Sequence, residues 1–155
     1  MNDITTPPAT SRVLEVPPPE PAVSAAAMRD KLGLHTDAWD LAQDLANAIE
    51  TLVVIDTRSR SHYLAGHIPG AISLPHVEMN PTTLAALARD RVYVCYCDGI
   101  GCNGSTWGTL KLATAGFTVK ELLGGLDFWQ RDGHPLASGP EPGSLADAQL
   151  AACGC

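Results

Sequence analysis

Two short apolar runs constrain the fold of this chain more than any other feature of its sequence. Leu52–Asp56 reads LVVID, and residues 91–97 read RVYVCYC. An apolar run of this length without polar alternation is typical of a strand that is buried on both faces. Such strands occur in parallel sheets whose two faces are covered by helices, so the runs predict an α/β fold.

Helical patterns alternate with strand-like runs along the chain. Helices are predicted at residues 38–48, 84–88, 105–115 and 126–131, and two further strands at residues 71–74 and 119–123. Thr36 or Asp37 is a suitable cap for the first helix, and Gly116 ends the third. This alternation predicts a parallel sheet with helices on both faces.

Proline content marks the edges of the predicted domain. Half of the twelve prolines lie in the first 21 residues. Because proline fixes φ and lacks an N–H, residues 1–21 are predicted to form a flexible leader. Residues 22–138 are predicted to form the domain. Residues 139–155 are small and polar and are predicted to form a flexible tail with a weak helix near residues 145–152.

Length and composition exclude several classes of protein. The 155 residues suit a single domain. The net charge of −7 argues against a nucleic-acid partner, because phosphate contacts need clustered Lys and Arg. No apolar run approaches the roughly 18–20 residues of a membrane helix, and no secretory signal begins the chain. The five cysteines are therefore expected to be thiols, and the protein is expected to be cytoplasmic.

The segment after the second apolar run carries the strongest chemical signal. Residues 97–105 read CDGIGCNGS and are called the cysteine loop below. Glycines allow successive backbone N–H groups to converge on an anion, and the N-terminus of the following helix adds more N–H groups and its dipole. A cysteine at the start of such a loop is stabilised as a nucleophilic thiolate. The loop contains no Lys or Arg, so backbone dipoles must supply this stabilisation.

Several motifs in order resemble the rhodanese family. Residues 62–75 (HYLAGHIPGAISLP) resemble the family motif in which a tyrosine precedes GHIPGA and a short strand, and residues 54–58 (VIDTR) resemble its strand ending in D-x-R. The rest of the family order is matched by Tyr96, Cys97, Ser105, Leu112, Gly116, Phe117, Gly124, Gly125 and Trp129. The resemblance covers about residues 24–136 and implies a rhodanese-like, five-stranded parallel sheet with helices on both faces.

The resemblance also implies a site and a chemistry. Cys97 would carry sulfane sulfur as a persulfide and act as the catalytic residue. The cradle for that sulfur would be Asp98, Gly99, Ile100, Gly101, Cys102, Asn103, Gly104 and Ser105, with support from Asp56, Arg58 and His67. The expected partners are a small-molecule sulfur donor such as thiosulfate and a thiol or cyanide acceptor, with no metal and no organic cofactor.

A second cysteine distinguishes this loop from the common single-domain form. The loop is about two residues longer and is similar to a rhodanese subgroup that reads YC-x-G-x-x-C. Cys97 is favoured as the nucleophile because it ends the predicted strand, and Cys102 is the alternative. Cys102 either resolves a Cys97 persulfide, leaving a disulfide and releasing sulfide, or merely packs nearby.

Two further functions compete with a sulfurtransferase. One is a non-catalytic sulfur-carrying or regulatory module, and the other is an arsenate or redox enzyme that uses Cys97 and Cys102 as a dithiol. A cysteine phosphatase is disfavoured, because Asn103 stands where that chemistry needs an arginine.

The remaining candidate residues have structural interpretations. Cys95 lies within the strand and is expected to pack as a small apolar side chain. Cys153 and Cys155 are too few to close a zinc site, and the five histidines lack metal-ligand spacing. Phe128 and Trp129 are expected to anchor the last helix in the core.

Overall fold

The computed structural model describes residues 10–146, which fall into one unit ending at Lys31 and a second starting at Leu32. The first unit contains a short 3-10 helix, η1 (Val13–Glu15), and most of helix α1 (Pro21–Leu34), and neither helix has a buried residue. The sequence did not predict α1, because its apolar side chains gather on no single face. The predicted tail cysteines, Cys153 and Cys155, and most of the predicted tail helix lie outside the described residues.

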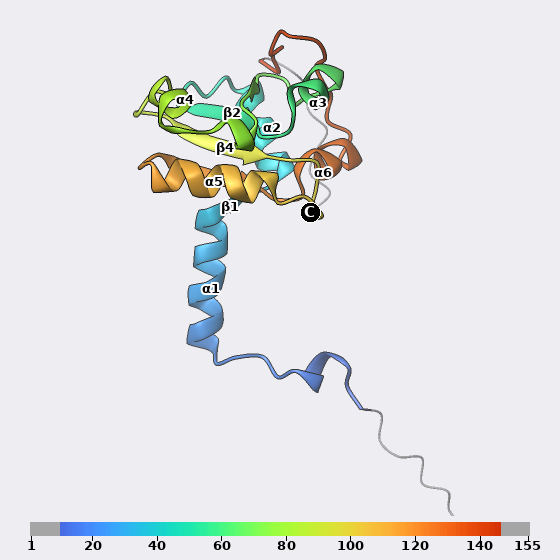
Figure 1. Ribbon diagram of the computed structural model, residues 1–155. Helices are drawn as coiled ribbons and strands as arrows, with labels where there is room; N and C mark the ends of the chain where they lie inside the picture. Colours follow the sequence, from blue (N-terminus) through green and yellow to red (C-terminus); the bar gives the residue numbers. More distant parts are fainter. Residues whose placement is uncertain (1–9, 147–155) are drawn as a thin grey trace, which may run out of the picture. The chain divides into compact units, whose positions relative to one another are not determined.

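The second unit is built on a five-stranded, entirely parallel sheet, which confirms the predicted fold (Figure 1). The strand order is β1-β5-β4-β2-β3. The strands are β1 (His35–Thr36), β2 (Leu52–Asp56), β3 (Ile72–Ser73), β4 (Val92–Tyr96) and β5 (Thr118–Leu122). The two apolar runs, β2 and β4, are neighbours in the middle of the sheet. Strand β1 was not predicted, because two residues carry no readable pattern.

The pairing of β2 with β4 sets the position of the cysteine loop. Leu52 pairs with Val92, and the register continues to the pair of Asp56 and Tyr96. Both strands therefore end at the same level, and the residue that follows Tyr96 is Cys97. In open parallel sheets this carboxyl end is where ligands bind.

Local sequence explains where most of the helices begin. They are α2 (Ala38–Ala46), α3 (Arg60–Ala65), α4 (Pro81–Ala85), α5 (Gly104–Thr114) and α6 (Gly125–Arg131), with a 3-10 turn η2 (His76–Glu78). Asp37 caps α2 by accepting from the Asp40 N–H at 2.9 Å. Helix α4 starts before the predicted residue 84, because Asn80 forms a capping box with Thr83 ahead of it. Within the described part of the chain, no helix is long and apolar enough to cross a membrane.

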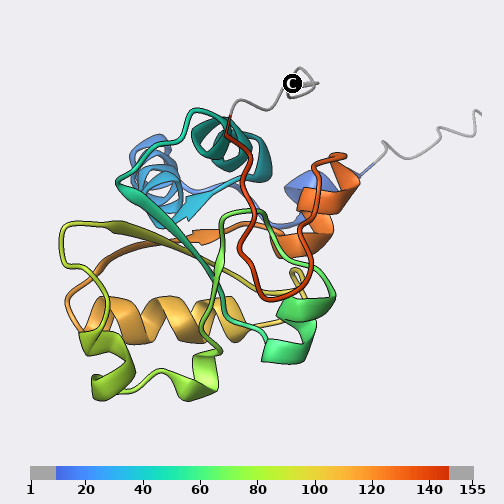
Figure 2. The same cartoon turned by 90° about the horizontal axis from the view of Figure 1, so that it is seen from above.

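Helices cover both faces of the sheet. Helices α4 and α5 lie on one face, and α2 and α6 lie on the other (Figures 1 and 2). Along β4, Tyr93 and Cys95 join the apolar cluster on the α5 side. Val94 and Tyr96 join the opposite cluster, which contains the fully buried Trp129 of α6. The near-continuous apolar sequence of β4 is thus explained by burial on both sides.

The segment after α6 packs back onto the domain. His67 and Ala137 exchange two backbone hydrogen bonds of 2.9 Å, and the Gly70 N–H donates to the Pro142 carbonyl at 2.7 Å. Leu145 is only 5% exposed and belongs to the cluster of Trp129. Ordered packing therefore continues past residue 138, where the sequence placed the end of the domain. The composition of residues 139–155 did not reveal this packing, because a single buried leucine hardly changes the composition of a segment whose other residues are mostly small and polar.

Leu145→Ala should lower the free energy of unfolding by about 2–4 kcal/mol, because it removes a buried side chain from the main core. Leu110→Ala is the matched control: Leu110 is 53% exposed on α5, and its truncation should change stability by less than about 0.5 kcal/mol. Urea denaturation of both variants measures the difference. Equal effects would show that residues after 138 do not contribute to the core.

Candidate active site

Cys97 lies at the carboxyl end of β4, beside an open cleft of about 300 Å³. The cleft is also lined by Thr57, which follows β2, and by His76, which follows β3. Cys102 and Gly104 complete its wall on the side of α5. The sheet topology thus brings the favoured nucleophile to the place where an α/β sheet is expected to bind a ligand.

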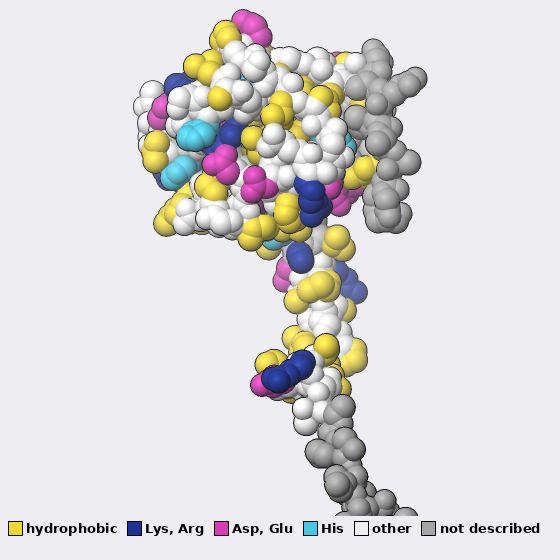
Figure 3. Space-filling model, turned by 90° about the vertical axis from the view of Figure 1, so that its right-hand side faces the viewer, with side chains coloured by type: hydrophobic (Ala, Val, Ile, Leu, Met, Phe, Trp, Pro, Cys, Tyr) yellow, Lys and Arg dark blue, Asp and Glu magenta, His cyan; other side chains and the backbone are white. Residues whose placement is uncertain are grey.

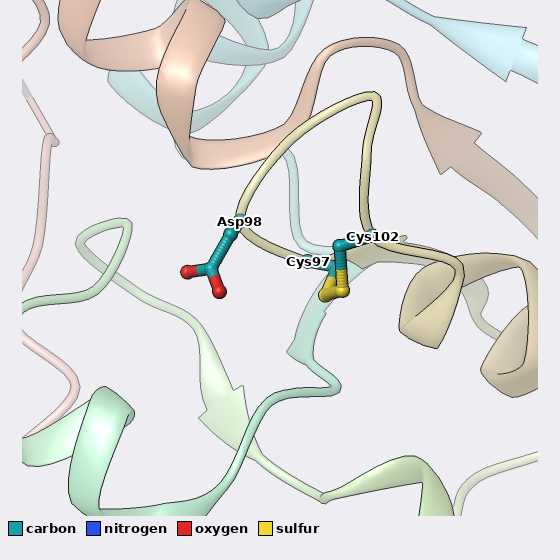
Figure 4. Close-up of side chains that lie close together, drawn as sticks. All are labelled: Cys97, Asp98 and Cys102. Carbon is teal, nitrogen blue, oxygen red and sulfur yellow. A yellow bond between two sulfur atoms is a disulfide. The ribbon is translucent and has the colours of Figure 1, made fainter.

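The cysteine loop folds back so that its two cysteines meet (Figure 4). The Cys102 N–H donates to the Gly99 carbonyl at 3.0 Å, which closes a turn within the loop. Cys97 and Cys102 form a disulfide, with their Cα atoms 6.2 Å apart. Cys97 is only 4% exposed, whereas Cys102 is partly exposed. The sequence left open whether Cys102 bonds to Cys97 or merely packs near it, and in the structure the two cysteines are bonded.

Helix α5 begins against the Cys97 sulfur. A Cβ atom added at Gly104 would lie 3.1 Å from the Cys97 Sγ and 3.3 Å from the His76 ring, so glycine permits this close approach. The preceding residue, Asn103, makes no side-chain capping bond. The first N–H groups of a helix lack intrahelical partners and carry the positive end of its dipole. The start of α5 therefore favours negative charge on this sulfur.

The start of α6 holds the other side of the cysteine loop. The Leu126 N–H donates to the Cys97 carbonyl at 3.0 Å, and the Asp127 N–H donates to the Asp98 carbonyl at 2.7 Å. Gly125 has φ +53°, and a Cβ atom there would lie within 2.4 Å of the Cys97 carbonyl oxygen. These contacts fix the two peptide groups next to the sulfur. The sequence contained a signal for them, the Gly124–Gly125 pair, but did not assign it to the site.

A buried ion pair connects the cysteine loop to the sheet. Asp56 is fully buried and accepts hydrogen bonds from Arg58 at 2.7 Å and from the Tyr96 hydroxyl at 2.6 Å. Arg58 also donates to Asp98 at 3.0 Å and to the Gly66 carbonyl at 2.6 Å. Asp56 and Arg58, which the sequence expected to support the site, thus form a buried ion pair, and Asp98 of the loop also pairs with Arg58.

The surroundings of these groups shift two pKa values. Burial disfavours the Arg58 charge, but the hydrogen bonds and charge of Asp56, with the hydrogen bond to Asp98, raise its pKa above the ordinary value. Burial and the Asp56 charge also raise the pKa of Tyr96. Arg58 therefore stays charged and Tyr96 stays protonated, so both remain donors to Asp56.

His67 is a buried structural residue whose ring nitrogens contact backbone carbonyls. Its ring is fully buried and stacks on Tyr63, with the ring centroids 3.7 Å apart. Its Nδ1 contacts the Tyr63 carbonyl at 2.8 Å, and its Nε2 contacts the Glu141 carbonyl at 3.1 Å. His67 is not among the residues that line the cleft beside Cys97. It supports the segment after α6 rather than the sulfur.

Six residues that line the cleft were not predicted as site residues from the sequence: Thr57, Ser59, His62, Pro75, His76 and Val77. Thr57 donates from its hydroxyl to the Tyr96 carbonyl at 2.8 Å, and the His62 Nδ1 lies 2.6 Å from the Ser59 hydroxyl. The His76 N–H donates to the Thr57 carbonyl at 3.0 Å. Thr57 and His76 follow strand ends, which was the available signal. Only the order of the strands shows that these ends face Cys97.

Three residues of the cysteine loop have the composition of a small metal site. The ligand atoms of Cys97, Asp98 and Cys102 lie within 4.8 Å of one another. The two sulfur atoms are bonded to each other, and the Asp98 carboxylate pairs with Arg58. Metal binding by these residues would therefore require reduction of the disulfide first.

A larger hollow lies away from this chemistry. It measures about 500 Å³ and lies between α4 and α5, with Met79, Leu84 and Leu110 among its lining residues. Its wall is mainly apolar and contains no cysteine, so we place the candidate site at the smaller cleft. Figure 3 shows one face of the molecule, where acidic, basic and histidine side chains are interspersed rather than gathered into a patch of one charge.

Comparison with known proteins agrees with this arrangement. Residues 40–132 match the model of the family described as the rhodanese-like domain. The chain belongs to the rhodanese-like family. Among solved structures, the BH2092 protein of Bacillus halodurans is similar at a TM-score of 0.73 and 34% identity, over 86% of this chain and 95% of that one. A rhodanese-related protein of Thermoplasma volcanium is similar at a TM-score of 0.58 and 25% identity, over 67% of this chain and 97% of that one.

Two named relatives extend the comparison of this rhodanese-like chain. An HTH-type transcriptional regulator of Mycobacterium tuberculosis is 36% identical over 120 residues, which are 77% of this chain and 53% of that protein. The chain thus spans about half the length of that regulator. A protein named sulfurtransferase from Allochromatium vinosum is 29% identical over 102 residues, which are 66% of this chain and 92% of that protein.

Gly125→Ala should destabilise the protein by at least about 2 kcal/mol, because it adds a contact with the Cys97 carbonyl to the cost of a positive φ. Gly133→Ala is the matched control. Gly133 has φ +80° with nothing within 4 Å of an added Cβ, so the change should cost only about 1 kcal/mol. Chemical denaturation compares the two variants. The same loss for both would mean that the close approach at Gly125 imposes no constraint.

Cys95 should resist alkylation in the reduced, native protein at pH 8. It is fully buried, and burial raises the pKa of its thiol to about 12, so it stays protonated well above that pH. Iodoacetamide labelling followed by peptide mapping should show modification at Cys97 and Cys102 and at Cys95 only after unfolding. Native labelling of Cys95 at the rate of Cys102 would contradict its burial.

Proposed function

We propose that this rhodanese-like chain is a sulfurtransferase that carries sulfane sulfur as a persulfide on Cys97. The observation that carries the proposal is the contact of the Cys97 sulfur with the N-terminus of α5, because a persulfide is an anion at neutral pH. The sulfurtransferase named among its relatives supports the same chemistry.

The first half-reaction loads the sulfur. Once the disulfide is reduced by a dithiol, the Cys97 thiolate attacks the outer sulfur of a donor such as thiosulfate. A new S–S bond forms, the S–S bond of the donor breaks, and sulfite leaves with the bonding electron pair. The negative charge moves to the outer sulfur and stays beside the N–H groups of α5, which stabilise it without reorganisation.

The second half-reaction passes the sulfur on. A thiolate or cyanide attacks the outer sulfur of the persulfide, and the Cys97 thiolate leaves. The cleft beside Cys97 is open, so a small acceptor has access to this sulfur. The ion pairs of Arg58 with Asp56 and Asp98 hold the loop in position during both steps. These three residues do not react with the sulfur themselves.

The proposal also covers the organisation of the chain and its location in the cell. We propose that the transferase is a cytoplasmic protein whose folded part is preceded by a Pro-rich leader. Its donor and acceptor are small sulfur compounds, and its cycle uses the loop residues 98–105 as the cradle.

Cys97→Ser should abolish sulfur loading, because serine offers no thiolate. The reduced variant is mixed with thiosulfate and should release no sulfite, whereas the wild-type chain releases one sulfite for each sulfur atom that Cys97 takes up. Cys95→Ala is the matched control and should retain turnover in a cyanide-coupled assay, because Cys95 lies in the core and outside the cleft. Normal loading of Cys97→Ser would overturn the assignment.

A regulatory module is the second candidate. The observation that favours it is the regulator that shares 36% identity, of which this chain spans about half. In that case Cys97 would accept sulfur as a signal without passing it to cyanide at a useful rate. Sulfite release from thiosulfate together with negligible thiocyanate production would favour the module over the enzyme.

A further inference from the structure

We propose that the chain also reduces sulfane sulfur to sulfide, with Cys102 as the resolving thiol. This inference rests on the proposed persulfide at Cys97 and adds a second fate for its sulfur. The observation that carries it is the disulfide between Cys97 and Cys102, because this bond is the product that such a reaction leaves behind.

The loop geometry brings Cys102 to the inner sulfur. The turn closed by the Cys102 N–H and the Gly99 carbonyl returns the chain to Cys97, so the two Cα atoms lie within the usual range for a disulfide. The loop is held from outside at both ends, by the start of α6 at Cys97 and by the start of α5 after Cys102. The Cys102 sulfur is thus held within bonding distance of the Cys97 Sγ, which remains the inner sulfur when Cys97 is a persulfide.

The reaction balances within the protein. The Cys102 thiolate attacks the Cys97 Sγ, and the Cys97–Cys102 bond forms. The bond from Cys97 to the outer sulfur breaks, and that sulfur leaves with the electron pair as hydrosulfide. The two cysteines are oxidised to the disulfide, and the sulfane sulfur is reduced to sulfide. The proton on the leaving hydrosulfide balances the one that the Cys102 thiol loses.

The exposure of the two cysteine residues indicates how an external dithiol would reduce the disulfide. Cys97 is 4% exposed, whereas Cys102 is partly exposed and also lines a second cleft of about 200 Å³ beside Glu121. A dithiol therefore attacks Cys102 and displaces the Cys97 thiolate, which leaves toward the N-terminus of α5. A leaving thiolate that is stabilised in this way departs faster. The second thiol of the reductant then releases Cys102.

The test compares the wild-type loop with Cys102→Ser, both in a background where Cys153 and Cys155 are serine. Each protein is reduced, freed of reductant and mixed with thiosulfate without oxygen. The wild-type loop should release one sulfide per chain and form the Cys97–Cys102 disulfide. Cys102→Ser should retain the added sulfur, with sulfide release slower by at least about 100-fold, because the intramolecular attack is lost. The same wild-type protein without thiosulfate is the control and should keep both thiols free.

The outcomes separate this inference from the proposed transferase. If the wild-type loop retains its sulfur, releases no sulfide and keeps Cys102 as a free thiol, Cys102 is not a resolving residue, while the loading itself upholds the transferase. If Cys102→Ser releases sulfide at the wild-type rate, the inference is also wrong. If neither the wild-type loop nor Cys102→Ser takes sulfur from thiosulfate, the persulfide on Cys97 and everything built on it fail together.

Discussion

At the carboxyl ends of β2 and β4, one buried carboxylate joins the two strands, and its arginine partner binds the cysteine loop. Asp56 is fully buried and is neutralised by Arg58, while Tyr96 donates to it from the neighbouring strand. Removal of a single partner from such a group would leave a buried charge unpaired, which costs several kcal/mol. Because Arg58 also binds Asp98, the position of the cysteine loop depends on this pair.

The N-termini of two helices contact different parts of Cys97. The start of α6 binds the carbonyl oxygens of Cys97 and Asp98, and the start of α5 lies against the sulfur. A carbonyl oxygen carries partial negative charge and a thiolate carries a full one, so each is placed where backbone N–H groups lack intrahelical partners. This arrangement offers backbone N–H groups to a negative sulfur without Lys or Arg in the loop, as the proposed persulfide on Cys97 requires.

The second cysteine changes what such a site can do with its sulfur. A rhodanese-like site with one cysteine depends on an external acceptor for its sulfur, whereas in the proposed reaction the Cys102 thiol attacks within the same loop and supplies electrons that reduce this sulfur to sulfide. The cost is a dependence on reductant, since the disulfide removes the nucleophile of the transfer reaction. In the proposed cycle, sulfur donor, acceptor and dithiol would compete for one pair of sulfur atoms, and their relative supply would decide whether sulfur is passed on or released.

The sequence by itself determined the class of fold and the candidate nucleophile. The apolar runs at β2 and β4 need two covered faces, and the glycine-rich loop after β4 begins with Cys97 at the strand end, so both can be predicted from local pattern. Tertiary structure alone decided the rest. In the folded chain Asp98 pairs with Arg58, and Thr57 and His76 line the cleft. His67 contacts the segment after α6 and does not line the cleft, and Leu145 packs into the core. These contacts link residues far apart in the chain, and strand order, which no local pattern encodes, brings them together.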